Sequence, residues 1–217
     1  MKQKTILKSL KIITIIYCLI YTSGCSANKT NDLNLSNVKT TEIINHYSNG
    51  NIKEQGQFTY GKREGKFVFY YENGGIEVEE NYTNGQLNGR LLEYYENGQV
   101  TSEGYWENGE REGKFVYYYE DGKVSSESHW ENGKQEGKAN LYYKNGKLET
   151  TINWKNGAME GPFIVYHKNG LTKQTGNLIN SKQNGETLEY YSDGRLKTKT
   201  IYKDGDIISE EKGEEDK

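Results

Sequence analysis

Cysteine is nearly absent from this sequence of 217 residues, and its two cysteines, Cys18 and Cys25, both lie within the first 25 positions. The rest of the chain therefore has no thiol for a structural disulfide or for a cysteine-based zinc site. Proline occurs once, and no stretch keeps the apolar period of an α-helix. Helices are accordingly not expected, and the body of the chain is predicted to be all-β.

Long hydrophobic runs are missing as well. The longest largely apolar run covers residues 12–21, which is too short to span a bilayer comfortably. It follows a lysine-rich start and precedes Thr22-Ser23-Gly24-Cys25, the layout of a secretory signal. This ending resembles a bacterial lipobox, although Thr22 stands where that pattern usually has Leu, and the resemblance implies that Cys25 is lipidated. The alternative is an ordinary cleaved signal with an incidental cysteine.

An excess of basic charge is also lacking. The chain has 28 Lys and Arg against 31 Asp and Glu, and removal of the leader with its four lysines leaves 24 basic residues against 31 acidic ones. Because affinity for nucleic acids depends on neutralising phosphates with Lys and Arg, the acidic mature chain is not expected to bind nucleic acid.

What the sequence does contain is a 24-residue repeat. Asn-Gly or Asp-Gly recurs seven times at this interval, and two further glycine rows keep the same step with Ser181 as an exception. Such self-similarity indicates a repeat architecture, in which few residues are unique. The three rows are Gly50, Gly74, Gly98, Gly122, Gly146, Gly170 and Gly194; Gly61, Gly85, Gly109, Gly133, Gly157 and Gly205; and Gly65, Gly89, Gly113, Gly137, Gly161 and Gly185.

Each copy has two strands and two turns. In the third copy, residues 98–106 are predicted as the first strand, 107–113 as a loop, 114–119 as the second strand, and Glu120-Asp121-Gly122 as the turn into the next copy. We expect this last turn to be the tight one, with positive φ at both central residues, and the loop to be wider. The predicted fold class is an elongated single-layer ribbon of stacked antiparallel β-hairpins, with about seven repeats.

Alternation along the strands assigns the side chains to two faces. We interpret one face as a buried structural spine of Tyr70, Tyr94, Trp106, Tyr118, Trp130, Tyr142, Trp154 and Tyr166. The opposite face varies more and has more apolar side chains than water favours, so that it is either covered by curvature of the ribbon or binds a partner. Its candidate partner-binding residues are Phe67, Phe69, Phe115, Tyr117, Tyr119, Leu141 and Phe163.

The repeat unit reads Tyr-Tyr-Glu-Asn-Gly-x-Val, then an aromatic residue, then Glu-Asn-Gly-x-x-x-Gly-x-Phe. It resembles MORN repeats, specifically the bacterial variant of YwqK-type antitoxin-like proteins, over roughly residues 46–205. The resemblance implies a ribbon of successive β-hairpins, and the family's name implies toxin neutralisation. Eukaryotic relatives are linked to phospholipid or protein contacts, but the acidic balance of this chain argues against anionic lipid.

No residues form a recognisable catalytic or metal-binding pattern. The histidines His46, His129 and His167 lack the ligand spacing of a metal site, and His46 and His167 occupy positions that are Tyr in other copies. Most carboxylates recur in the turns, whereas a catalytic pair needs contrasting environments. We therefore predict no catalytic residue, no metal site and no cofactor, and a protein that is not an enzyme.

The predicted organisation is a lipoprotein signal peptide at 1–24, a flexible tether at 25–45, a MORN-like repeat array at 46–208 and a charged, disordered tail at 209–217. The functional hypothesis is an exported, lipid-anchored protein of a bacterial cell envelope, acting as a non-catalytic protein-interaction scaffold for an unknown protein partner. One alternative is an antitoxin or immunity-type protein that sequesters a toxin. A remoter one is a protein that binds or acts on cell-wall glycan.

Overall fold

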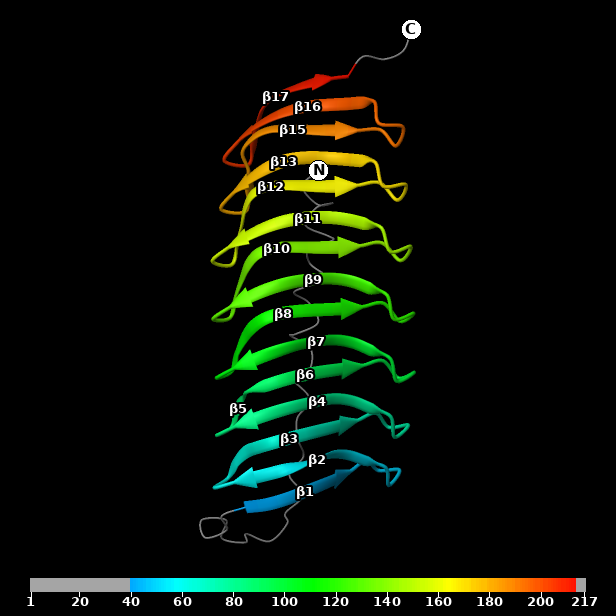
Figure 1. Ribbon diagram of the computed structural model, residues 1–217, viewed down its shortest axis with the longest axis vertical. Coiled ribbons are helices and arrows are strands. Elements are labelled where there is room, and N and C mark those ends of the chain that lie inside the picture. The colour runs from blue at the N-terminus through cyan, green and yellow to red at the C-terminus, as the bar shows by residue number, and fades with distance from the viewer. Residues whose placement is uncertain (1–39, 214–217) are drawn as a thin grey trace. The chain divides into compact units, whose positions relative to one another are not determined.

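The computed structural model describes residues 40–213, which form β-strands joined by turns (Figure 1). The predicted signal peptide, Cys25 and most of the tether lie outside the described residues. Within residues 40–213 there is no helix that could cross a membrane. The strands are β1 (Thr40–His46), β2 (Ile52–Thr59), β3 (Lys62–Tyr70), β4 (Ile76–Thr83), β5 (Gln86–Leu87), β6 (Gly89–Tyr94), β7 (Val100–Glu107), β8 (Glu110–Tyr118), β9 (Val124–Glu131), β10 (Lys134–Tyr142), β11 (Leu148–Lys155), β12 (Ala158–Tyr166), β13 (Thr172–Ile179), β14 (Lys182–Gln183), β15 (Gly185–Tyr190), β16 (Leu196–Lys203) and β17 (Asp206–Lys212).

The strands pair antiparallel in chain order and form one open sheet, with β1 and β17 as its first and last strands. The two-residue strands β5 and β14 extend the ladders between β4 and β6 and between β13 and β15. Successive hairpins thus stack along the sheet (Figure 1). The predicted fold class, an all-β ribbon of stacked antiparallel hairpins, is confirmed.

The tight turn and the longer turn have exchanged places relative to the prediction. The tight turns are the two-residue Asn-Gly type, as at Asn108 and Gly109, with φ of 51° and 85°. The turn from Tyr119 to Lys123 is the longer one, closed by Tyr119 N donating to the Lys123 carbonyl at 2.8 Å. Only its glycine, Gly122, has positive φ, because the Asp121 carboxylate accepts from Lys123 N at 3.2 Å and holds the turn in an Asx conformation.

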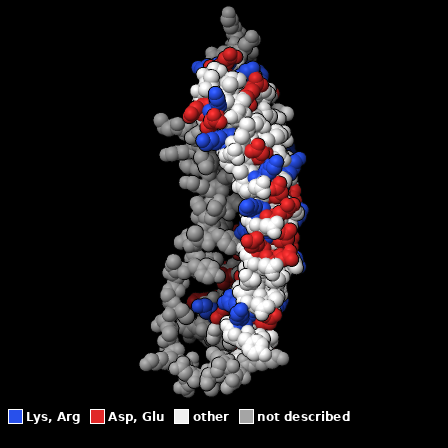
Figure 2. Space-filling view, turned by 90° about the vertical axis from the view of Figure 1, so that its left-hand side faces the viewer, with Lys and Arg blue, Asp and Glu red and all other residues white. Residues whose placement is uncertain are grey.

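Each kind of turn lines one side of the sheet, so that the ribbon has a tight-turn edge and a long-turn edge (Figure 1). Figure 2 faces the tight-turn edge and shows acidic and basic side chains interspersed along it. Along this edge a carboxylate of one copy accepts from a turn amide of the next, as Glu112 does from Asn132 N at 3.0 Å. The same contact recurs at Glu64–Asn84, Glu136–Asn156 and Glu160–Asn180.

Along the long-turn edge an aromatic side chain joins each copy to the next. The Tyr119 hydroxyl donates to the Tyr142 carbonyl at 2.5 Å, and the equivalent bonds start from Tyr47, Tyr71, Tyr95 and Tyr143. His167 occupies the same place, with Nε2 at 3.0 Å from the Tyr190 carbonyl. These edge bonds add side-chain cohesion to the backbone ladders between neighbouring copies.

The array extends beyond the predicted boundaries at both ends. β1 covers residues 40–46, of which 40–45 were assigned to the tether, because its backbone pairs with β2 from Thr40 to His46. β17 covers residues 206–212, of which 209–212 were assigned to the tail, because it pairs with β16. The charged side chains of β17 are exposed on a sheet edge, where charge is compatible with strand structure.

Candidate functional site

Two faces of the sheet differ in chemistry, and the predicted spine is divided between them. The rings of Trp106 and Trp130 lie 6.2 and 5.9 Å from that of Phe115, so the tryptophans share a face with the phenylalanines. Tyr118 lies on the opposite face, where its hydroxyl donates to Glu103 at 2.6 Å. We call these the Phe face, which carries Phe67, Phe115 and Phe163, and the Tyr face, which carries Tyr94, Tyr118 and Tyr142. The prediction of one buried aromatic row was therefore wrong.

The deepest row of the molecule lies on the Phe face. Phe67, Phe115 and Phe163 are exposed by only 0, 4 and 2%, so their prediction as partner-binding residues was wrong. A single-layer sheet buries them because each ring lies flat on a glycine of the adjacent strand. A Cβ atom on Gly56, Gly104 or Gly176 would overlap the ring of Phe67, Phe115 or Phe163 respectively.

Side-chain size alternates along this row. Leu91 is paired with Gly104, and Ala139 with Ile152, and all four are buried. A large residue on one strand thus meets a small one on the next, which keeps the packed volume nearly constant from copy to copy. The row forms the core of the sheet.

Arg63 closes the row in the first copy. Its guanidinium lies 4.8 Å from the ring centroid of Phe67 and 5.1 Å from that of Tyr82, in cation-π geometry. It also bonds the Tyr82 hydroxyl at 2.8 Å and pairs with Glu80 at 3.9 Å and Glu54 at 3.7 Å. Burial raises the pKa of the Glu80 carboxyl, although the Tyr82 bond and Arg63 oppose this.

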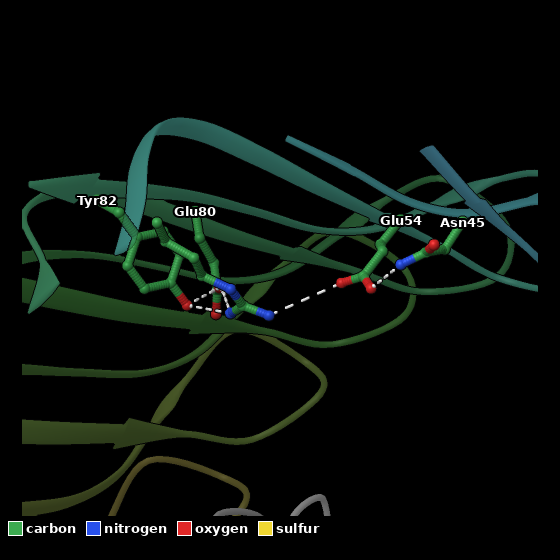
Figure 3. A network of polar contacts seen from close by, with 5 residues as sticks. Asn45, Glu54, Glu80 and Tyr82 are labelled. Atoms are coloured by element: carbon green, nitrogen blue, oxygen red, sulfur yellow. Dashed lines mark hydrogen bonds and ion pairs between the residues drawn. The ribbon is translucent and has the colours of Figure 1, made fainter. Parts of the chain in front are cut away.

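This network joins four strands, because Asn45 of β1 donates to Glu54 at 2.7 Å. Figure 3 shows Glu54, Glu80 and Tyr82 around one guanidinium, with Asn45 bonded to Glu54 on its far side. Burial, followed by the bond to Glu80, raises the pKa of Tyr82 well above its usual range. The Tyr82 hydroxyl therefore keeps its proton at neutral pH and donates it to the Glu80 carboxyl at 2.5 Å.

Arg111 occupies the same position two copies later. Its guanidinium lies 4.6 Å from the ring centroid of Trp130, 4.9 Å from that of Phe115 and 5.6 Å from that of Trp106. It also opposes the burial that raises the pKa of Tyr117. Because the guanidinium stacks on Trp106 and Trp130, these rings are partly covered and offer less surface for stacking a sugar.

The remaining predicted partner residues divide into two groups. Phe69, Tyr117 and Leu141 lie on the Phe face and are half-buried, so part of each stays accessible. Tyr119 instead belongs to the bonds of the long-turn edge. Sequence reasoning missed Arg63 and Arg111, although their spacing is two repeats. It also missed Gly56, Gly104 and Gly176, which stand outside the three glycine rows but keep the same phase.

The Tyr face carries a ladder of cation, carboxylate and tyrosine. Lys114 pairs with Glu127 at 2.7 Å, and Glu127 also accepts from the Tyr142 hydroxyl at 2.6 Å. These two bonds, with Lys114 the larger cause, lower the pKa of Glu127 to about 2. Burial, followed by the bond to Glu103, raises the pKa of Tyr118 to about 12. The ladder repeats at Lys66–Glu79–Tyr94 and Arg90–Glu103–Tyr118.

Other candidate sites are shallow or incomplete. An open depression of about 350 Å³ lies at the long-turn edge and is lined by Asn97, Tyr119, Glu120, Asp121 and Lys144. Residues 40–213 contain no group of three or more side chains suited to hold a metal ion.

Comparison with protein-family models finds the MORN repeat variant in five copies, together half of the chain. The matches cover residues 63–84, 87–108, 111–132, 135–156 and 183–204. The unmatched interval between the last two includes Ser181, which replaces the turn glycine and has a φ of 66°. A search of curated proteins finds no match.

Proposed function

The chain belongs to the MORN repeat variant family, and from this premise we propose that it is a non-catalytic scaffold for protein interactions, anchored to a bacterial envelope membrane through lipidated Cys25. Repeats of this family generally serve protein or membrane interactions. The observation that carries the proposal is a group of half-exposed apolar side chains beside the buried row of the Phe face, at a strand position that holds Glu93 in the second copy and Glu189 in the sixth. Its members, which we call the apolar strip, are Phe69, Tyr117, Leu141 and Val165.

The side chains of the apolar strip are only half-buried, so a partner can bury their remaining apolar surface. The core row beside it is already closed, since Phe115 lies on Gly104 and under Arg111. Covering the accessible part of the strip with a partner would contribute about 25 cal/mol per Å² of apolar surface. Arg63 and Arg111 flank this surface, and arginine and aromatic residues are enriched at the centres of protein interfaces.

The proposed lack of catalysis is supported by the surroundings of the carboxylates. Glu79, Glu103 and Glu127 each have a cation and a tyrosine hydroxyl as partners. Acid–base catalysis by two carboxylates requires environments that push their pKa values apart, whereas these three share one environment. The proposed anchor is supported by the leader, whose basic start, apolar run and small residues precede Cys25.

The partner surface is tested by two tyrosines of one copy that lie on opposite faces. A photoreactive phenylalanine analogue replaces Tyr117 of the apolar strip or, as the matched control, Tyr105, which is 48% exposed on the Tyr face. After illumination of cells, we expect a crosslinked protein from position 117 and a much weaker product from position 105. Equal products from both positions, or a product from 105 alone, would contradict a partner on the Phe face.

The second candidate is an antitoxin-type role, suggested by the resemblance to the YwqK-type variant. It uses the same face but requires one tight partner that is toxic when free. Co-expression distinguishes the two roles, since an antitoxin restores growth to cells producing the crosslinked partner and a general scaffold does not. Binding of cell-wall glycan is disfavoured, because Arg111 stacks on the two tryptophans that would hold a sugar.

A further inference from the structure

Charge is segregated along the long-turn edge. Seven turns line this edge, and the fourth, Tyr119–Lys123, is the middle one. The second and third turns are acidic through Glu72 and Glu96, whereas the fifth and sixth are basic through Lys144, Lys147 and Lys168. The turns at the two ends contribute no net charge, because the first has no charged residue and the last contains the ion pair of Asp193 and Arg195, 2.9 Å apart.

These side chains are available for contact with another molecule. Glu72, Glu96, Lys144 and Lys168 are exposed, and none forms an ion pair with another residue of the described array. They also lie at equivalent places in their turns, one turn lying about 10 Å from the next because each copy adds two strands. At their second position, turns two to six hold Glu72, Glu96, Glu120, Lys144 and Lys168. These turns follow one another along one side of the sheet (Figure 1).

Outside the middle turn, this order is complementary to its own reverse. Rotation by half a turn about the middle turn brings Glu72 onto Lys168 of a second copy and Glu96 onto Lys144. Each pair then occurs twice, as in any isologous interface. Two copies aligned in the same direction would instead place like charges together, which is unfavourable.

The fourth turn would lie on the twofold axis of this pairing. The shallow depression lies there, lined by Tyr119, Glu120, Asp121 and Lys144. Glu120 of this turn would face Glu120 of the second copy, a like-charge contact that the four pairs of opposite charge outnumber. Asp121 and Lys123 beside it form an exposed ion pair at 2.8 Å. The tight-turn edge lacks such order: Thr83 and Gln86 of its second turn would face Ile179 and Lys182 of its sixth.

We propose that the protein pairs with a second copy of itself, antiparallel and side by side along the long-turn edge, through Glu72–Lys168 and Glu96–Lys144 contacts. A polyanion would find only the basic half of this edge attractive, whereas a reversed copy matches both halves. Four exposed ion pairs change an association constant by roughly 4-fold to 1,000-fold. The dimer is accordingly weak in solution and sensitive to salt. Anchoring in one membrane would strengthen it by raising the effective concentration.

The test is a charge swap in the full chain, measured by sedimentation in detergent. The swapped chain carries Glu72→Lys, Glu96→Lys, Lys144→Glu and Lys168→Glu, and all four sites are exposed, so its melting temperature should equal that of the parent. Antiparallel pairing predicts that parent and swapped chains each self-associate but form mixed dimers at least ~10-fold more weakly. Raising the salt from about 50 to about 500 mM should weaken both self-associations.

Three results would overturn the proposal. In the first, mixed dimers form as tightly as the parent dimer, which would indicate parallel or unspecific contact. In the second, the swapped chain keeps its fold but not its self-association. In the third, the parent stays monomeric at low salt, whether or not it binds inorganic polyphosphate, which would assign the basic turns to a polyanion instead.

Discussion

Replacing Gly104 with alanine should destabilise the sheet, although the new side chain is one methyl group. The added Cβ would overlap three ring atoms of Phe115, which is 4% exposed and held by Arg111 from the other side. The ring therefore cannot move without opening the row. Overpacking of this kind costs about 1–3 kcal/mol, which corresponds to a fall in melting temperature of roughly 2–12 °C for a domain of this size.

Replacing the Phe115 ring with a smaller side chain should relieve the destabilisation caused by Gly104→Ala. In the second copy the equivalent hairpin positions hold Glu80 and Leu91, so leucine tolerates a side chain larger than glycine beside it. Phe115→Leu alone should cost roughly 1 kcal/mol. Adding it to Gly104→Ala should cost little more, with a coupling energy of roughly 1–2 kcal/mol between the two sites.

The assay is urea unfolding of the full chain for the parent, the two single variants and the double variant. Ser125→Ala, which changes a half-buried strand residue on the Tyr face, is the control for strand propensity and should shift stability by less than about 0.5 kcal/mol. Additivity of Gly104→Ala and Phe115→Leu to within about 0.3–0.5 kcal/mol would refute the ring-on-glycine packing.

Three further outcomes are expected. Tyr60 has a φ of 51° in the first tight turn, so Tyr60→Asn should raise the free energy of unfolding by about 0.5–1 kcal/mol in urea unfolding; a loss of stability would contradict the turn assignment. The pKa of Glu127 is about 2, below its unfolded value of about 4.3, so its stabilising contribution is complete above that value and is lost as the pH falls towards 2. In a carboxyl NMR titration Lys114→Gln should raise the Glu127 midpoint, and an unchanged midpoint would mean that Lys114 is not the main cause. Cys25→Ala should abolish palmitate labelling and move the protein out of the membrane fraction, and unchanged fractionation would exclude lipidation as the anchor.

The sequence predicts the strands well and the faces poorly, for a physical reason. Alternation separates Phe115 and Tyr117 from Val116 and Tyr118, but both sets are apolar or aromatic. Both sets also contain a buried residue, since Phe115 is exposed by 4% and Val116 by 7%. Which aromatic ring is buried depends on what the adjacent strand presents, and that requires the cross-strand register. Phe115 is buried because Gly104 on the adjacent strand has no side chain, which leaves room for the ring against the backbone.

The turns illustrate a similar limit. Asn-Gly occurs at both ends of the hairpins, so composition alone cannot say which pair takes positive φ at both residues. The structure assigns this conformation to Asn108 and Gly109, while Asp121 uses its side chain to bond Lys123 N and leaves only Gly122 in the left-handed region. The number of residues between the last paired positions of the strands determines the turn type, and the pairing is not visible in the sequence.

The central claim is that the Phe face has a closed core row and, beside it, an apolar strip that holds a partner. The most direct measurement compares partner affinity and melting temperature for three variants. Leu141→Ser in the apolar strip should weaken binding of the crosslinked partner at least ~10-fold, while its Tm falls by about 2–4 °C per kcal/mol of lost burial. Leu188→Ser, a half-buried leucine of the Tyr face, should cost similar stability without changing the affinity. Phe115→Ala should lose about 3–5 kcal/mol of stability. An affinity that Leu141→Ser leaves unchanged, or that Leu188→Ser reduces as strongly, would contradict the account.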